Sequence, residues 1–95
     1  MTKPKYGASV DINQKEIVDA LKQIGCDVLV IGTPVDLLCG YRKHNILIEV
    51  KRPGVKPRKD QKAQRDFLKN WKGQVRVCSS PEEAIRLVTR AYQNS

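Results

Sequence analysis

The strongest constraint on the fold of this chain is a pair of short apolar segments, each of which carries one carboxylate. The first spans residues 35–38 (VDLL), the second spans residues 46–50 (ILIEV), and a polar, glycine-bearing stretch at 40–45 separates them. Apolar runs of this length on either side of a turn predict a β-hairpin. Because side chains alternate between the faces of a strand, Glu49 and Lys51 should emerge side by side from the second strand.

The two carboxylates of this predicted hairpin, Asp36 and Glu49, suggest a metal site. A carboxylate inside an apolar strand is costly to bury unless it is paired or bound to a metal. If the strands pair antiparallel, Asp36 can approach Glu49, and a divalent cation is the usual remedy for the resulting repulsion. The pattern favours Mg²⁺ or Mn²⁺ with Lys51 beside it. On an exposed edge strand, the same three residues would instead be ordinary solvated charges.

The length and composition limit the class of protein. Ninety-five residues with 40% hydrophobic and 29% charged content suit one small globular domain. Cys26, Cys39 and Cys78 match neither a disulfide framework nor a zinc spacing, which favours reduced, buried thiols in a cytoplasmic protein. No apolar run resembles a signal peptide or approaches the length of a membrane span, so we expect no membrane partner.

The order of predicted elements is α-β-β-β-α-β-α. Residues 1–10 are interpreted as a basic lead-in, and residues 11–95 as the folded domain, whose first helix has Asp11 as N-cap and ends near Ile24 before Gly25. The remaining elements are a strand at 26–31, the two carboxylate strands, a loop at 52–57, a helix at 58–72, a strand at 74–78 and a helix capped by Ser80. The fold class is therefore α/β, with a mixed sheet flanked by helices.

Polar side chains interrupt the apolar stripes of the first two predicted helices. Asn13 and Glu16 extend the stripe of the first helix, and Gln64 occupies the position before Phe67 in the second. A polar group on an inward face requires a partner. Each of the three residues is therefore either a cap or satisfied structural residue, or a member of the carboxylate site.

Positive charge is concentrated in one segment of the chain. The chain has 18 Lys and Arg against 10 Asp and Glu, a formal net charge of +8, which favours a polyanionic partner such as nucleic acid. Most of the surplus lies in residues 51–72, directly after the carboxylate strand. The side chains that we expect to contact DNA are Arg52, Lys56, Arg58, Lys59, Lys62, Arg65 and Lys69.

Taken in order, these features resemble the PD-(D/E)xK nuclease superfamily. The finer pattern is similar to the small stand-alone phage members related to the VRR nuclease domain. The matching stretches are residues 11–18, 36–42 and 48–51 (IEVK), followed by Gln64 and residues 71–75. The usual Pro-Asp pair is Val35-Asp36 here, with the proline displaced to Pro34, and no Val-Arg-Arg triplet occurs. These departures weaken the assignment to a subfamily more than the expectation of catalysis, because both carboxylates and the lysine are present.

The resemblance implies a restriction-endonuclease-like fold and metal-dependent hydrolysis of phosphodiester bonds in DNA. Asp36, Glu49 and the Val50 carbonyl would hold Mg²⁺ or Mn²⁺, and Lys51 would orient the attacking water and stabilise charge on the phosphate. Gln64 and Glu16 match positions that support the metal shell or the lysine.

The resemblance also implies partners for the chain. Relatives of this small type often act as homodimers on duplex or branched DNA, including flaps. A phage-encoded protein acting inside a host cell would fit this description. The alternative from a different class is a non-catalytic basic module that binds DNA or RNA.

Overall fold

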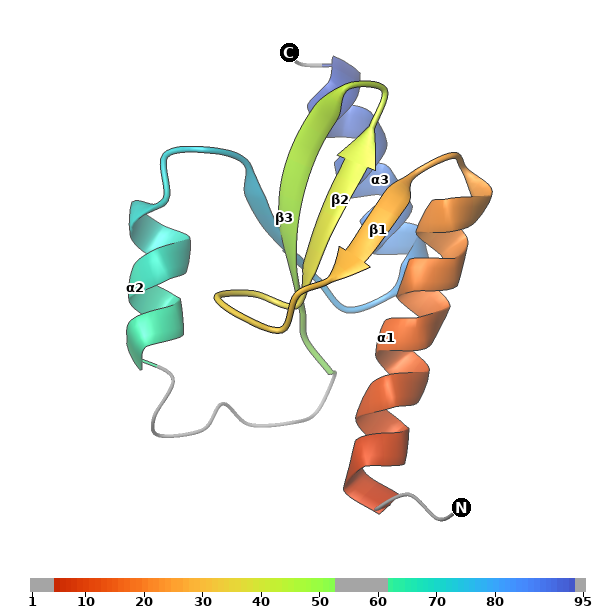
Figure 1. Ribbon diagram of the computed structural model, residues 1–95, viewed down its shortest axis with the longest axis vertical. Helices are drawn as coiled ribbons and strands as arrows, with labels where there is room; N and C mark the ends of the chain where they lie inside the picture. The colour runs from red at the N-terminus through yellow and green to blue at the C-terminus, as the bar shows by residue number, and fades with distance from the viewer. Residues whose placement is uncertain (1–4, 53–61, 94–95) are drawn as a thin grey trace.

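The computed structural model of the protein describes residues 5–52 and 62–93, and for residues 5–12 it describes the backbone alone. Its elements are α1 (Lys5–Gln23), β1 (Asp27–Val30), β2 (Leu37–Tyr41), β3 (His44–Val50), α2 (Lys62–Asn70), β4 (Val75–Cys78) and α3 (Pro81–Gln93). Figure 1 shows them arranged as a single small α/β unit. The predicted order α-β-β-β-α-β-α is therefore confirmed.

The four strands form one mixed sheet in the order β1-β2-β3-β4. β1 pairs antiparallel with β2 and β2 with β3, whereas β4 lies parallel to β3. The β2–β3 register pairs Leu37 with Ile48 and Tyr41 with His44, so the predicted hairpin is present. Its turn is shorter than the predicted 40–45 connection, because the strands continue on both sides until only Arg42 and Lys43 remain between them.

One face of the sheet is covered by α1 and α3 and forms the core (Figure 1). Alternate residues of β2 and β3 point into this layer and are fully buried, as are residues of both helices. The core positions are Ile17 and Leu21 of α1, Leu37 and Cys39 of β2, Ile46 and Ile48 of β3, and Ala84 and Val88 of α3. The period-2 pattern of β2 and β3 thus meets the helical stripes of α1 and α3.

The caps predicted at the end of α1 and at the start of α3 are confirmed. Gly25, two residues after the end of α1, adopts a φ of +101°, and its N–H donates to the Lys22 carbonyl at 3.0 Å. At the start of α3, the Glu83 N–H donates to Ser80 Oγ at 3.1 Å, while Glu83 Oε1 accepts from the Ser79 N–H at 2.8 Å. These short-range contacts determine where the chain leaves and enters the two helices.

The predicted start of the first helix is wrong. α1 begins at Lys5, so Asp11 lies within the helix instead of capping it, and residues 5–10 of the expected lead-in are helical. The sequence explains this, because no proline occurs between Lys5 and Gln23, and Pro4 stands just before the helix, where proline is compatible with a helix start. The helix predicted over 58–72 is described from Lys62 to Asn70, and positions 58–61 lie outside the described residues.

α2 differs from the other two helices in its packing. It stands beside the sheet in Figure 1 and buries none of its residues. Phe67 stacks on Trp71 with ring centroids 5.0 Å apart, and the Trp71 N–H closes the last turn by donating to the Phe67 carbonyl at 2.9 Å. Within residues 5–52 and 62–93, no helix has the length and apolar content needed to cross a membrane.

Candidate active site

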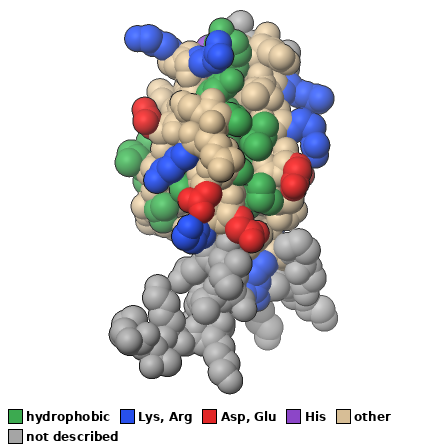
Figure 2. Space-filling model, turned by 90° about the vertical axis from the view of Figure 1, so that its right-hand side faces the viewer, with side chains coloured by type: hydrophobic (Ala, Val, Ile, Leu, Met, Phe, Trp, Pro, Cys, Tyr) green, Lys and Arg blue, Asp and Glu red, His purple; other side chains and the backbone are tan. Residues whose placement is uncertain are grey.

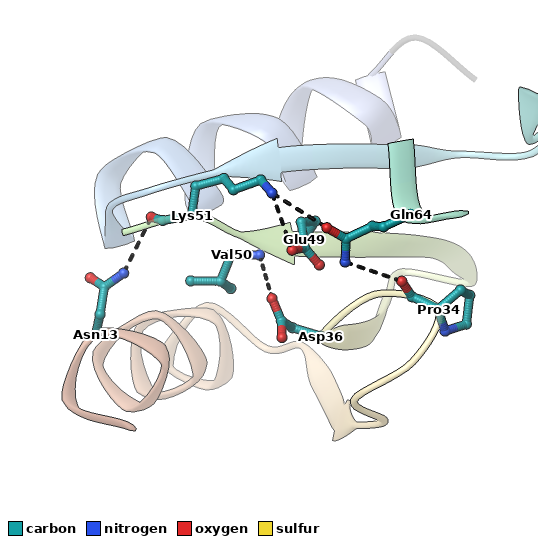
Figure 3. A network of polar contacts seen from close by, with 7 residues as sticks. All are labelled: Asn13, Pro34, Asp36, Glu49, Val50, Lys51 and Gln64. Carbon is teal, nitrogen blue, oxygen red and sulfur yellow. Dashed lines mark hydrogen bonds and ion pairs between the residues drawn. The ribbon is translucent and has the colours of Figure 1, made fainter. Parts of the chain in front are cut away.

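The β2–β3 pairing brings the two predicted carboxylates together. Leu37 pairs with Ile48, and continuing this antiparallel register by one residue brings Asp36 opposite Glu49. Asp36 Oδ2 accepts a hydrogen bond from the Val50 N–H at 2.8 Å (Figure 3). This bond attaches the half-buried Asp36 side chain to the last residue of β3, so both carboxylates lie at the carboxyl-terminal end of that strand.

Glu49 is the one buried charged residue in the described part of the chain, with 5% of its surface exposed. Burial is the main cause that raises the pKa of Glu49 to about 7, and the charge and hydrogen bonding of Asp36 act in the same direction. Lys51 opposes this shift, because its Nζ lies 3.5 Å from Glu49 Oε2. Glu49 thus sits in an environment where its ionised form is poorly stabilised.

The second carboxylate oxygen of Glu49 lacks a donor. Oε1 is buried and has no hydrogen-bond partner among the described groups. Two ionised carboxylates cannot hydrogen-bond to each other, so either a proton on Glu49 or a cation between the acids is needed. The first remedy agrees with the raised pKa of Glu49, and the second with a metal site.

Lys51 and Gln64 form a polar link between β3 and α2. Lys51 Nζ donates to Gln64 Oε1 at 3.4 Å, and Gln64 Nε2 donates to the Pro34 carbonyl at 3.3 Å (Figure 3). Gln64 therefore does have a partner at the site, and its amide holds a lysine whose side chain is 42% exposed. Sequence reasoning missed Pro34 as an acceptor, because nothing in a sequence marks a single backbone carbonyl as a ligand.

The two polar residues of α1 have different positions. Asn13 is half-buried, and its Nδ2 donates to the Lys51 carbonyl at 3.4 Å, which connects α1 to the end of β3. Glu16 is exposed, so its predicted place on an inward face is wrong. The inward face of α1 is centred on Ile17 and Leu21, and one residue turns the helix by about 100°, which directs Glu16 away.

The acidic residues of the site are therefore two and not three. Across the described side chains, residues 13–52 and 62–93, no group of three or more His, Cys, Asp or Glu is arranged to hold a metal. The structure thus does not bring Glu16 to Asp36 and Glu49. A backbone oxygen is available at the same place, because the C=O and N–H of a strand residue point to the same side, and the Val50 N–H faces Asp36.

The predicted DNA-binding residues divide into three groups. Arg52 is half-buried, and its Nη1 has no hydrogen-bond partner among the described groups. Lys62, Arg65 and Lys69 are exposed and share one face of α2 at i, i+3, i+7 spacing. The remaining positions, Lys56, Arg58 and Lys59, lie outside the described residues.

Asp36, Glu49 and the Val50 backbone offer oxygen ligands of the kind that Mg²⁺ and Mn²⁺ prefer, and the unsatisfied Glu49 Oε1 fits a cation there. Comparisons of the chain with protein-family models, with curated proteins and with solved structures found no match. The chemistry of the site is therefore the remaining guide to function. The site consists of two close carboxylates, an adjacent lysine and a side-chain amide that accepts a hydrogen bond from the lysine.

Proposed function

We propose that this protein is a metal-dependent endonuclease of the PD-(D/E)xK type, which hydrolyses phosphodiester bonds in DNA. The observation that carries the proposal is the buried Glu49 carboxylate, which lies beside Asp36 with Oε1 lacking any donor in the described structure. Burying such a group is unfavourable for folding, and binding a divalent cation would remove that penalty. Binding a catalytic metal would explain why a carboxylate occupies this buried position.

In this proposal, Asp36, Glu49 and the Val50 carbonyl hold Mg²⁺ or Mn²⁺. When bound, the metal supplies Lewis-acid polarisation of the phosphate and a more acidic water. The Val50 N–H holds the Asp36 carboxylate by the 2.8 Å bond to Oδ2, so this ligand is oriented before any substrate arrives. An oriented ligand loses little freedom on binding, which favours metal affinity.

Lys51 acts on the scissile phosphate. Its ammonium lies 3.5 Å from Glu49 Oε2 and 3.4 Å from Gln64 Oε1, and it is exposed enough to meet a ligand. There it stabilises the negative charge that increases on the phosphate oxygens in the transition state. Gln64 is a positioning residue, because it holds the ammonium and is itself anchored on the Pro34 carbonyl.

The substrate in this proposal is duplex or branched DNA, such as a flap. The formal net charge of +8 and the exposed basic face of α2 provide non-specific attraction to the phosphate backbone. These basic residues lie on the same short helix as Gln64, which contacts Lys51, so DNA bound along α2 would be close to the carboxylate site.

We also propose that the active form is a homodimer. Apolar side chains are left uncovered just after α2 and on the edge strand β1: Trp71 is 48% exposed, Leu29 60% and Val30 61%. A second copy would cover these side chains through a two-fold interface. Sedimentation of the purified protein tests this: we expect a dimer that Trp71→Lys or Leu29→Lys converts to a monomer. A monomeric wild-type protein at the concentration used for cleavage would contradict it.

The decisive experiment uses linear, flap and four-way DNA with and without Mn²⁺. We expect cleavage only with the metal, and none by Asp36→Asn, which removes a ligand charge while conserving volume. Lys15→Gln, at an exposed position of α1, is the matched control and should cleave normally. Metal-independent cleavage, or full activity in Asp36→Asn, would contradict the proposal.

A non-catalytic module that binds DNA or RNA is the second candidate. It is favoured by one observation, namely that the described residues bring two carboxylates together and not three or more. In that case the protein would bind nucleic acid without cleaving it, and Asp36→Asn would leave binding unchanged with and without Mn²⁺. The same set of substrates therefore distinguishes the two functions.

A further inference from the structure

The turn between β2 and β3 is built from two large basic residues in a conformation that they rarely adopt. Arg42 has a φ of 49° and Lys43 a φ of 74°, both in the left-handed region. A two-residue hairpin with positive φ at both positions favours Asn-Gly, because glycine has no Cβ and the short polar side chain of asparagine tolerates the left-handed region better than longer side chains do. Strain of this kind persists where the surrounding structure holds it, and it often marks a functional site.

Arg42 is held in place by two aromatic rings. Its Cζ lies 5.6 Å from the centre of the Tyr41 ring and 5.4 Å from that of Tyr92, at the end of α3. The two rings meet edge to face, with centroids 5.8 Å apart. Hydrogen bonding to Tyr92, and to a smaller extent to Tyr41, raises the pKa of Arg42. The side chain of Arg42 nevertheless remains exposed. The guanidinium is thus oriented and still accessible to a ligand.

The surroundings of this turn are basic. The sequence has no acidic residue between Asp36 and Glu49 and none after Glu83, whereas Arg86 and Arg90 follow on α3. Asp27, which pairs with Gly40, is the acid that the sheet register brings toward this end. Figure 2 shows Lys and Arg side chains near the chain's single histidine, with the coloured acidic side chains lower on this face. An anion would therefore be attracted to this end of the molecule.

We propose that Arg42 and Lys43, here called the hairpin tip, form a second contact with the DNA backbone, remote from the carboxylate site. This inference rests on the proposed function, since it assigns a second contact to the same substrate. Oriented guanidinium groups match phosphate oxygens, and the adjacent ammonium adds a second positive charge.

The position of the hairpin tip predicts the length of DNA that it requires. Six residues of extended chain separate Asp36 from Arg42, which corresponds to about 20 Å at about 3.4 Å per residue. The same distance covers about six base pairs of duplex. The protein should therefore hold a duplex longer than about six base pairs at two places, and a shorter one at only one.

The test replaces the tip by the turn sequence that its backbone favours. Arg42→Asn/Lys43→Gly removes both charges and relieves the strain, so the thermal midpoint should stay the same or rise. Binding to a duplex of about twenty base pairs, in EDTA so that no metal or cleavage intervenes, should weaken roughly tenfold at low salt. The salt slope should fall by about two, which is the release of counterions from two phosphates.

Two controls keep the result interpretable. Lys15→Gln/Lys22→Gln removes the same charge from exposed positions of α1 and should change the salt slope by less than half as much. Lys43→Gly alone leaves the contacts of Arg42 with Tyr41 and Tyr92 intact and should give about half the slope change of the double variant. A hairpin-capped stem of about five base pairs should show a smaller loss than the long duplex.

The outcomes separate this inference from the proposed nuclease function. Equal salt slopes for wild type and tip variant, or an equal loss in the α1 control, would overturn the tip contact, whether or not the protein cleaves DNA. Loss of binding in the tip variant would support it, even if the wild type cleaved no DNA with any metal. A wild-type protein that binds no DNA in EDTA would overturn the tip contact directly.

Discussion

The two faces of the central sheet differ in what they bury. The face under α1 and α3 holds Leu37 and Ile48 with no exposed surface and carries no described charged residue that is fully buried. The opposite face holds Glu49, buried with an unsatisfied oxygen, and leaves Leu29 60% exposed. One face of the sheet thus supplies the apolar burial that stabilises the fold, whereas the other buries a carboxylate at a cost in stability.

The difference between the two faces predicts that truncating a side chain to alanine lowers the free energy of unfolding much more on the core face than on the opposite face. Ile48→Ala should lower the free energy of unfolding by about 2–5 kcal/mol, because it leaves a cavity in a fully buried layer. In the monomer, Leu29→Ala should change it by less than about 0.5 kcal/mol, because the side chain is largely exposed there. Urea denaturation measures both. Ile48→Val, with an expected loss of about 0.5–1.5 kcal/mol, provides a fallback if the alanine variant does not fold.

Removing the ammonium of Lys51 should affect chemistry more than binding. Lys51→Met keeps most of the apolar stem, and cleavage should fall at least roughly a hundredfold, as expected for one oriented electrostatic group. DNA affinity should change far less, because the other basic residues of the 51–72 segment remain. Single-turnover cleavage and DNA binding measured on one preparation decide this. Parallel losses would mean that Lys51 is only a phosphate contact.

The buried carboxylate should make the metal-free protein less stable as the pH rises. The pKa of Glu49 is raised from 4.5 to about 7, so the folded state keeps a proton that the unfolded state releases. Stability is therefore lost between about pH 4.5 and pH 7, by at most about 3 kcal/mol. Thermal midpoints in EDTA at pH 5 and pH 8 should show this loss in wild type.

Glu49→Gln is the matched variant for this measurement. The amide cannot ionise, so the variant should show a smaller loss between pH 5 and pH 8 and be more stable than wild type at pH 8. Adding Mn²⁺ at pH 8 should raise the thermal midpoint of wild type and leave that of the variant unchanged. Identical pH profiles for the two proteins would contradict the assignment of the penalty to Glu49.

The last prediction concerns the basic face of α2. Replacing Lys62, Arg65 and Lys69 by Gln should weaken DNA binding uniformly across sequences and reduce its salt slope by up to about three. Lys62 forms an exposed ion pair with Asp66 at 2.9 Å, so its replacement should affect stability little. An unchanged salt slope would show that the DNA does not pass along this helix.

The sequence predicted the architecture well where the signal is local. The apolar runs at 35–38 and 46–50 predicted the hairpin, although β2 begins at Leu37 and leaves Asp36 just before it. Ser80, Pro81 and Glu83 predicted the start of α3. The same reasoning failed at Asp11, because an acceptable N-cap does not show whether the residues before it are also helical. It failed at Glu16, because the apolar pattern of a helix does not show which residues at the margin of its apolar face will be covered by the neighbouring elements.

The sequence by itself determined the order of the elements, the hairpin and the three groups of the candidate site, because alternation, capping and turn chemistry act over a few residues. Only the tertiary structure decided how these groups meet. The Asp36–Val50, Lys51–Gln64, Gln64–Pro34 and Asn13–Lys51 hydrogen bonds join residues between 13 and 38 positions apart. Such contacts depend on sheet register and on helix placement, and so does the burial that leaves Glu49 Oε1 without a donor.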